Sequence, residues 1–193
     1  MTDKSLELSR RNIVLIAVLF EVPLMLPFVL KAIFYNASIS LSQISTKLLI
    51  ESLFYSLVLL FVNIIFCGLV YRFKVYSIIS FLEGVVEPLA RSLNIYQAMI
   101  VAIFAGLGEE FFFRGFLLPI TGLMVSSLLF AVLHFFYEIR KYLLLIVVYS
   151  LIGLVFGVLY ERSNNIWLVV FFHSMYDFLA LIYFKSRFSR NLK

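Results

Sequence analysis

Charged side chains are scarce in this chain. Asp, Glu, Lys and Arg make up 14% of its 193 residues and hydrophobic residues make up 63%, whereas globular domains average about 25% charged and about 45–50% apolar residues. A soluble core of this size cannot bury so much apolar surface. The composition therefore excludes an ordinary soluble domain. It predicts an all-α, polytopic transmembrane helix bundle, with residues 1–193 forming a single integral membrane domain.

Cysteine is almost absent, and basic residues are rare within the apolar runs. Cys67 is the only cysteine, so an intrachain disulfide is excluded, and its place in an apolar run predicts a small buried side chain. The net charge is +5, but the basic residues stand mainly in the gaps between apolar runs. That placement is typical of membrane proteins that contact anionic lipid. We therefore expect membrane lipid as a partner, and no nucleic acid.

Six apolar runs are long enough to cross a bilayer as helices. They fall at about 12–34, 48–71, 98–119, 122–138, 142–160 and 166–184. The break at 119–122, which contains Pro119 and Gly122, predicts a tight hairpin between the third and fourth helices. Residues 75–97 mix apolar and charged side chains and predict an interfacial amphipathic helix. No cleavage site follows the N-terminal run, so we expect it to be retained as the first span.

Lys and Arg are distributed unequally between the two sides of this arrangement. With both termini in the cytoplasm, twelve of them lie on the cytoplasmic side and three, Lys31, Lys47 and Arg162, lie outside. Cytoplasmic loops of membrane proteins carry such an excess. We therefore predict a multi-pass protein with six spans and both termini cytoplasmic. The abundance of Phe, Ile and Leu with little Ala favours a bacterial source, and hence the bacterial plasma membrane.

Glu109, Glu110 and Arg114 lie inside the third run, AIFAGLGEEFFFRGFLLPI. A charged side chain at mid-membrane costs roughly 2.5–3.5 kcal/mol on insertion scales, so such groups need partners and are functional candidates. Glu110 and Arg114 are four residues apart and can pair on one face of a helix. Glu109 is rotated by about 100° from Glu110. It can therefore point into a cavity and remain free for chemistry.

Both histidines of the chain also lie in apolar runs. His134 is in the fourth run, four residues after Phe130, and His173 is in the sixth, four residues before Asp177. A single histidine in a membrane helix is more often a packing or hydrogen-bonding residue than a ligand. These groups and the acidic pair of the third run have no water to solvate them, however. We therefore expect three helices to converge on one polar pocket.

Such a pocket suits hydrolysis at a carbonyl inside the membrane. A carboxylate and an imidazole can activate a water molecule as general bases, or a divalent metal such as zinc can do so. The pair of His173 and Asp177 can bind a developing oxyanion or complete a metal shell. Two non-enzymatic alternatives stay open: a membrane immunity or scaffold protein, and an ion-coupled carrier. Glu21 is either a water-accessible residue near a kinked helix end or part of the wall of a substrate cavity.

Three motifs follow one another, each in its own run. EEFFFRG (109–115) fits EExxxR, FAVLH (130–134) fits FxxxH, and HSMYD (173–177) fits HxxxN/D. In these motifs the chain resembles the CPBP family of CAAX-protease and bacteriocin-processing (Abi) membrane proteases, which is related to the prenyl-protein protease Rce1. The resemblance covers about 95–185 as a catalytic core and implies an intramembrane endopeptidase. The chain has no HExxH motif, which excludes a zinc protease of the site-2 type.

The resemblance also implies a role for each residue of the site. Glu109 would activate water with the assistance of His134, while Glu110 and Arg114 would support the site. His173 and Asp177 would form an oxyanion-binding corner. If the protein is instead a metalloprotease, a divalent metal such as zinc would be held by Glu109, His134, His173 and Asp177.

One position departs from the pattern of the eukaryotic-type relatives, which have Asn where this chain has Asp177. An Asn amide can donate a hydrogen bond, whereas an ionised Asp can only accept. The Asp therefore favours metal ligation or a protonated carboxyl that donates. Small bacterial members of the family imply bacteriocin self-immunity or peptide maturation. The expected substrate is a peptide or protein: a bacteriocin, a signalling peptide or a prenylated protein.

Overall fold

The computed structural model describes residues 3–34 and 41–190, and the side chains within 12–34 and 41–187. All regular structure in these ranges is helical, as the composition predicts. Within these ranges, four helices are long and apolar enough to cross a membrane. They are α1 (Asp3–Phe34), α2 (Thr46–Arg72), α8 (Leu143–Ser163) and α9 (Ile166–Arg190). They match the first, second, fifth and sixth predicted runs, and they indicate a multi-pass membrane protein. Lys193, one of the basic residues counted for the orientation, lies outside the described residues.

The third predicted run folds as three consecutive helical segments. α5 (Ile95–Glu110) is followed directly by a π-helix, η3 (Phe111–Leu117), and then by α6 (Leu118–Thr121). Gly122 takes a positive φ of 81°, and α7 (Leu123–Phe135) begins after it, so the predicted break is present. A π-turn within a helix occurs frequently at functional sites. This one begins immediately after Glu110.

α7, which corresponds to the fourth predicted run, is shorter than the predicted 122–138. The 13 residues of α7 span about 20 Å at about 1.5 Å per residue, which is less than the hydrocarbon core of about 30 Å. Phe136 and Tyr137 extended the apolar run in the sequence, but they lie in the turns that follow the helix, where they are exposed. An apolar pattern alone does not mark where a helix stops when aromatic residues continue into the loop.

The segment predicted as one interfacial helix over 75–97 is broken. It contains α3 (Tyr76–Phe81), a second π-helix, η2 (Leu82–Val86), and α4 (Glu87–Ser92), and a new helix starts at Ile95. Asn94 caps that start: its side chain accepts a hydrogen bond from the Gln97 backbone, and the Gln97 side chain accepts one from the Asn94 backbone. This reciprocal capping box separates α5 from the segment before it. A short 3-10 turn, η1 (Leu41–Gln43), precedes α2.

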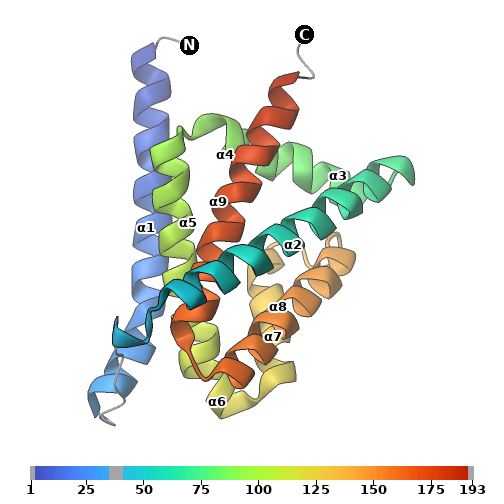
Figure 1. Ribbon diagram of the computed structural model, residues 1–193. Coiled ribbons are helices and arrows are strands. Elements are labelled where there is room, and N and C mark those ends of the chain that lie inside the picture. Colours follow the sequence, from blue (N-terminus) through green and yellow to red (C-terminus); the bar gives the residue numbers. More distant parts are fainter. Residues whose placement is uncertain (1–2, 35–40, 191–193) are drawn as a thin grey trace.

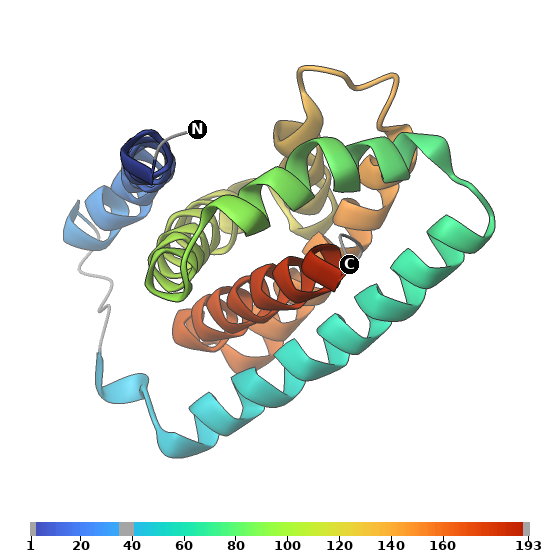
Figure 2. The ribbon, with the colours of Figure 1, turned by 90° about the horizontal axis from the view of Figure 1, so that it is seen from above.

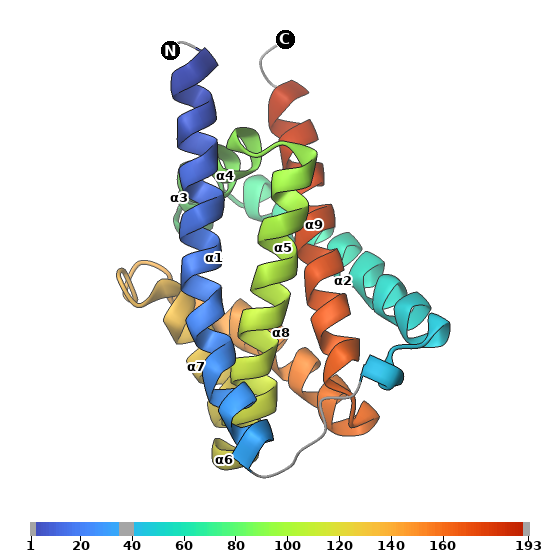
Figure 3. The ribbon, with the colours of Figure 1, turned by 90° about the vertical axis from the view of Figure 1, so that its left-hand side faces the viewer.

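α9 occupies the middle of the bundle (Figure 1). It packs against α5, α2 and α8, while α7 packs against α8. Viewed from above, α1 lies at one edge of the bundle, next to α5 (Figure 2). Figure 3 shows α1, α5 and α9 side by side. The acidic pair at the end of α5 is therefore held between α1 and α9. α1 begins and α9 ends at the same end of the bundle (Figure 1).

The distribution of side chains is the reverse of that in a soluble protein: many apolar side chains are exposed, and key ionisable side chains are buried. Phe20 on α1 and Phe61 on α2 are 68% and 64% exposed, whereas Glu110 and Arg114 are buried. Exposed apolar surface of this extent marks contact with lipid or a partner. The ionisable groups face the interior of the bundle instead, as membrane proteins require.

Candidate active site

Glycines let two neighbouring helices approach α5 closely beside the acidic pair. A Cβ added at Gly106 would lie 2.9 Å from the Val170 carbonyl oxygen on α9, and one added at Gly108 would lie 2.8 Å from the Glu21 carbonyl oxygen on α1. Real Cβ atoms essentially never come this close to a heavy atom. Small residues at such positions are what allows membrane helices to touch through their backbones. The acidic pair that follows these glycines is thereby placed at the meeting point of three helices.

Glu110 and Arg114 form the buried ion pair that their spacing predicts. Nη1 of Arg114 donates to Oε1 of Glu110 at 3.0 Å, and Nη2 donates to the carbonyl oxygen of Gly153 on α8 at 3.2 Å. The guanidinium carbon also lies 4.7 Å from the centroid of the Phe130 ring and 5.2 Å from that of Phe156. Hydrogen bonds and ring faces together offset the desolvation of this buried charge.

Glu110 also contacts His173, which helical spacing could not predict. Nδ1 of His173 lies 2.7 Å from the same Oε1 atom that accepts from Arg114. A carboxylate that is paired with a guanidinium acts as an acceptor, so the proton of this hydrogen bond belongs to Nδ1. Glu110 thus orients the imidazole of His173 and links α5 to α9.

Glu109 points toward two imidazoles. Its Oε1 lies 3.5 Å from Nε2 of His134, and its Oε2 lies 3.8 Å from Nε2 of His173. Both separations exceed the usual 2.7–3.2 Å of a hydrogen bond. Oε2 is buried and has no hydrogen-bond partner among the described residues. Because a buried polar atom without a partner is costly, this oxygen is an acceptor position for a water molecule or a substrate group.

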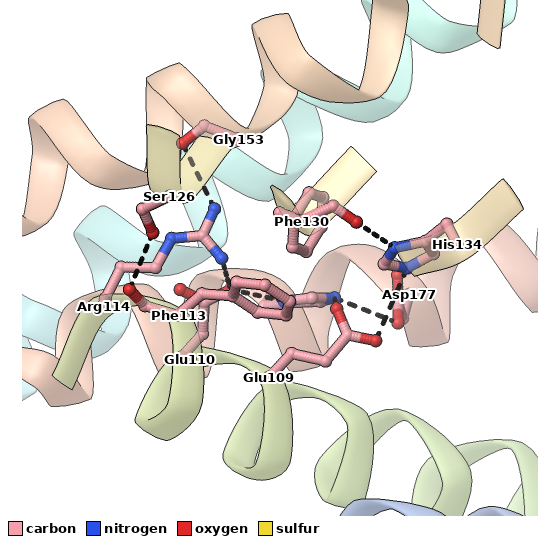
Figure 4. A network of polar contacts seen from close by, with 10 residues as sticks. Glu109, Glu110, Phe113, Arg114, Ser126, Phe130, His134, Gly153 and Asp177 are labelled. Atoms are coloured by element: carbon pink, nitrogen blue, oxygen red, sulfur yellow. Dashed lines mark hydrogen bonds and ion pairs between the residues drawn. The ribbon is translucent and has the colours of Figure 1, made fainter. Parts of the chain in front are cut away.

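His134 is held by its own helix. Its Nδ1 lies 2.7 Å from the carbonyl oxygen of Phe130, which can only accept, so Nδ1 carries a proton. In the neutral ring Nε2 is then an acceptor that faces Glu109 (Figure 4). The rings of Phe130 and Tyr149 pack against the imidazole, with centroids at 4.6 and 5.1 Å. The ring is therefore fixed in orientation, and Phe130 and His134 lie on one face of the helix, as their spacing of four residues indicates.

Asp177 completes the polar cluster next to His173. Its Oδ2 lies 3.4 Å from Nε2 of His173. At 3.4 Å this contact is longer than a usual hydrogen bond, but carboxylate oxygens near both ring nitrogens favour a doubly protonated ring of His173. The side chains of Asp177 and His134 are 31% and 29% exposed, compared with 8% for His173. Access for water or substrate is greatest on the side of Asp177 and His134.

All six ionisable residues predicted from the sequence meet in this cluster, on three separate stretches of chain. The structure adds groups that the sequence did not point to: the carbonyl oxygens of Gly153 and Phe130, and the ring of Tyr149. Backbone carbonyls carry no signal in a sequence. Gly153 does stand four residues before Gly157, a pattern that indicates close helix packing, but that pattern does not reveal a hydrogen bond to Arg114.

A family comparison bears on the same stretch of chain. Residues 91–179 match the family model described as type II CAAX prenyl endopeptidase Rce1-like. This segment is an Rce1-like domain. It includes all six ionisable residues of the site and excludes α1 and α2. The resemblance inferred from the three motifs is thereby confirmed.

One curated relative matches about half of the chain. The uncharacterized protein YpbD of Bacillus subtilis (strain 168) is 32% identical over 94 residues, which are 49% of this chain and 49% of YpbD. The match therefore spans about half the length of this relative. No solved structure matches the chain. The activity and substrates of the whole protein are thus matters for proposal.

A metal ion in the Rce1-like domain would need a cluster of donors. In the described part of the chain, no group of three or more His, Cys, Asp or Glu side chains is arranged to hold one. Nδ1 of His173 and Nδ1 of His134 already bind Glu110 and the Phe130 carbonyl, so only the Nε2 atoms of the two rings are open to a ligand. As placed, the side chains do not fit a metal site, and their free atoms suit hydrogen bonds to a water molecule better.

Proposed function

We propose that this protein is an intramembrane endopeptidase that hydrolyses a peptide bond with water activated by Glu109 and His134. The observation that supports this most strongly is the state of Glu109. Its Oε2 is buried without a hydrogen-bond partner among the described residues, and two imidazoles flank it. Oε2 of the neighbouring Glu110 also lacks a partner among the described residues, but its Oε1 accepts hydrogen bonds from both Arg114 and His173. One acid of the pair is therefore structural, and the other is free to move a proton.

The two groups can share one water molecule. A water bonded to Oε1 of Glu109 and Nε2 of His134 would lie about 2.8 Å from each, which their separation of 3.5 Å allows. In the proposed step, Glu109 takes a proton from this water as the water oxygen bonds to the peptide carbonyl carbon. General bases of this kind contribute about 10²–10⁴-fold to a rate. The hydroxyl group is thus delivered without a free hydroxide ion.

His173 is the group proposed to stabilise the oxyanion. With Nδ1–H bound to Glu110, a protonated ring presents Nε2–H toward the reacting carbonyl, and Asp177 lies beside it. As the tetrahedral intermediate collapses, the carbonyl re-forms and the C–N bond breaks. Glu109 then gives its proton to the leaving amine. The products are a carboxylic acid and an amine, and the enzyme returns to its starting state.

The biological setting is proposed on the same basis. The family name describes endopeptidases for CAAX prenyl proteins, so a prenylated protein, a bacteriocin or a signalling peptide is the proposed substrate class. Peptide maturation or bacteriocin self-immunity in a bacterial plasma membrane is the proposed role. The presence of a relative in Bacillus subtilis supports the bacterial assignment.

For topology we propose six passes with both termini in the cytoplasm, in which α5 with its continuation and α7 supply the third and fourth. Glu138 and Glu161 are exposed near the two ends of α8. Single cysteines introduced by Glu138→Cys and Glu161→Cys in a Cys67→Ser background should label differently. A membrane-impermeant maleimide should reach position 161 in intact cells and position 138 only after permeabilisation. Labelling of both positions from the same side would contradict the six-pass proposal.

Catalysis itself is tested by reconstitution. Purified protein in lipid nanodiscs is incubated with a peptide mixture, and new termini are identified by mass spectrometry. His134→Asn retains a donor for the Phe130 carbonyl but loses the atom that faces Glu109, so it should keep the melting temperature and lose cleavage. Glu51→Gln, an exposed acid on α2, serves as the matched control. Equal cleavage by the wild type and His134→Asn would refute the proposal and favour a scaffold.

A further inference from the structure

Glu21 is a half-buried acid that the proposed mechanism does not use. It lies on α1, outside the Rce1-like domain of residues 91–179. The backbone of Glu21 is in close contact with Gly108. A Cβ added at Gly108 would lie 2.8 Å from the carbonyl oxygen of Glu21 and 2.9 Å from the Cβ of Glu21. The added atom would also collide with Oε2 of Glu21. Gly108 directly precedes Glu109. The contact therefore holds the carboxylate of Glu21 next to the site.

One oxygen of the Glu21 carboxylate, Oε2, is buried and lacks a partner among the described residues. The charged groups around it are Glu109, His173, His134 and Asp177. Lys31, the basic residue near the end of α1, donates to the carbonyl oxygen of Gly115 instead. Glu21 thus faces the reactive cluster, and none of the described lysine or arginine side chains is among the groups that interact with it.

Charges in the cluster do not balance. Arg114 is committed to Glu110 by a hydrogen bond and an ion pair. That leaves the carboxylates of Glu21, Glu109 and Asp177 against two histidines, of which one is neutral in the proposed mechanism. A carboxylate in a low-dielectric site either takes up a proton or pairs with a cation, and a cation that displaces the proton is held strongly. The missing positive charge is therefore expected from outside the chain, at the place where the peptide binds.

We propose that Glu21 recognises a cationic group of the substrate, an ammonium or a guanidinium, near the scissile bond. The proposal rests on the proposed peptidase function and adds a substrate class to it: peptides that are basic close to the cleavage site. The cation has two possible sources, a Lys or Arg side chain and a free N-terminal amine. Each would meet the same carboxylate.

The experiment compares pairs of fluorescent peptides derived from a cleaved substrate. In the first kind of pair, one peptide carries Lys and the other norleucine at the same position near the scissile bond, and each such position is tested in turn. In the second kind of pair, one peptide has a free N-terminus and the other an acetylated N-terminus. The wild type should prefer the charged member of one pair by about 10–100-fold in kcat/KM, the range expected for a desolvated charge pair. The pair that shows the preference identifies the source of the cation.

Variants of Glu21 then assign this preference. Glu21→Gln should bring the ratio between the two peptides close to one, Glu21→Asp should keep part of it, and Glu51→Gln should leave it as in the wild type. A ratio that Glu21→Gln leaves unchanged would overturn the proposal, and so would an equal fall in the ratio for Glu51→Gln. The ratio is measured within one protein preparation, so partial loss of folded protein does not alter it.

A binding measurement separates this proposal from the peptidase proposal. In the Glu109→Gln background the same peptides are titrated by fluorescence anisotropy, with and without Glu21→Gln. Weaker binding of the basic peptide on Glu21→Gln supports cation recognition even if the wild type cleaves nothing, in which case only the peptidase proposal fails. If the wild type cleaves charged and neutral peptides equally well, the proposed role of Glu21 is refuted while the peptidase proposal stands.

Discussion

Nδ1 of His173 lies 2.7 Å from Oε1 of Glu110, a hydrogen bond between residues 63 positions apart in the chain. The same oxygen accepts from Arg114. Glu110 therefore connects a buried structural ion pair to an imidazole of the reactive cluster. Glu109, the adjacent acid, has no such hydrogen bonds. Substitutions at the two positions should consequently separate folding from chemistry.

Removing one member of the buried ion pair should destabilise the protein. Arg114→Leu leaves the Glu110 charge without its guanidinium in the interior, and breaking a buried pair in this way costs about 3–5 kcal/mol. We expect a clear fall in the melting temperature of the protein in detergent, measured by tryptophan fluorescence.

The double variant Glu110→Gln with Arg114→Leu provides the control. Because it removes both charges together, it should be less destabilised than the sum of the two single variants, with a coupling of about 0.5–3 kcal/mol. Strictly additive losses would show that the pair does not act as a unit.

The close approach of α5 to α9 depends on Gly106. In Gly106→Ala the new methyl group would meet the Val170 carbonyl oxygen at 2.9 Å and the Ser174 backbone nitrogen at 3.0 Å. The two helices must move apart, so both the melting temperature and the cleavage rate should fall. Both quantities are measured on the purified variant.

Gly68→Ala is a matched control, because Gly68 lies within α2 with no heavy atom within 4 Å of an added Cβ. Alanine is favoured over glycine in a helix by about 1 kcal/mol, so this variant should be as stable as the wild type or more so. Tolerance of alanine at both positions would contradict the packing described for the site.

Chelation distinguishes a water bound only by protein groups from a metal-bound water. Since no three donor side chains among the described residues are arranged around a common point, turnover should survive prolonged treatment with EDTA or 1,10-phenanthroline. The assay compares cleavage rates before and after dialysis, together with the metal content of the protein. Loss of activity that added zinc restores would reverse this expectation and assign Asp177 a ligating role.

Most of the site could be predicted from the sequence, because the spacing of its residues and the cost of charge in an apolar run both limit which side chains can pair. Glu110 and Arg114 are four apart on one helix, and charges in an apolar run need partners, so their pairing follows from spacing and energy alone. The convergence of His134 and His173 on the acidic pair follows from the same need. All of these contacts are present in the structure.

Other features depend on tertiary packing that a sequence does not display. The hydrogen bond from His173 to Glu110 depends on the relative rotation of α5 and α9, which Gly106 permits. The π-helix that begins at Phe111 and the early end of α7 at Phe135 look like ordinary apolar helix in the sequence. For Glu21 the sequence leaves two interpretations open, and its contact with Gly108 depends on where α1 packs.

The central claim is that Glu109 moves the proton of the attacking water, and Glu109→Gln tests it most directly. The amide keeps the size of the side chain but cannot take a proton, so kcat should fall by about 10²–10⁴-fold. Substrate affinity and melting temperature should stay close to wild-type values, since Glu109 makes no structural ion pair with lysine or arginine among the described residues. Single-turnover kinetics with a cleaved peptide give kcat, and anisotropy gives affinity. A Glu109→Gln enzyme that cleaves at the wild-type rate would contradict the account.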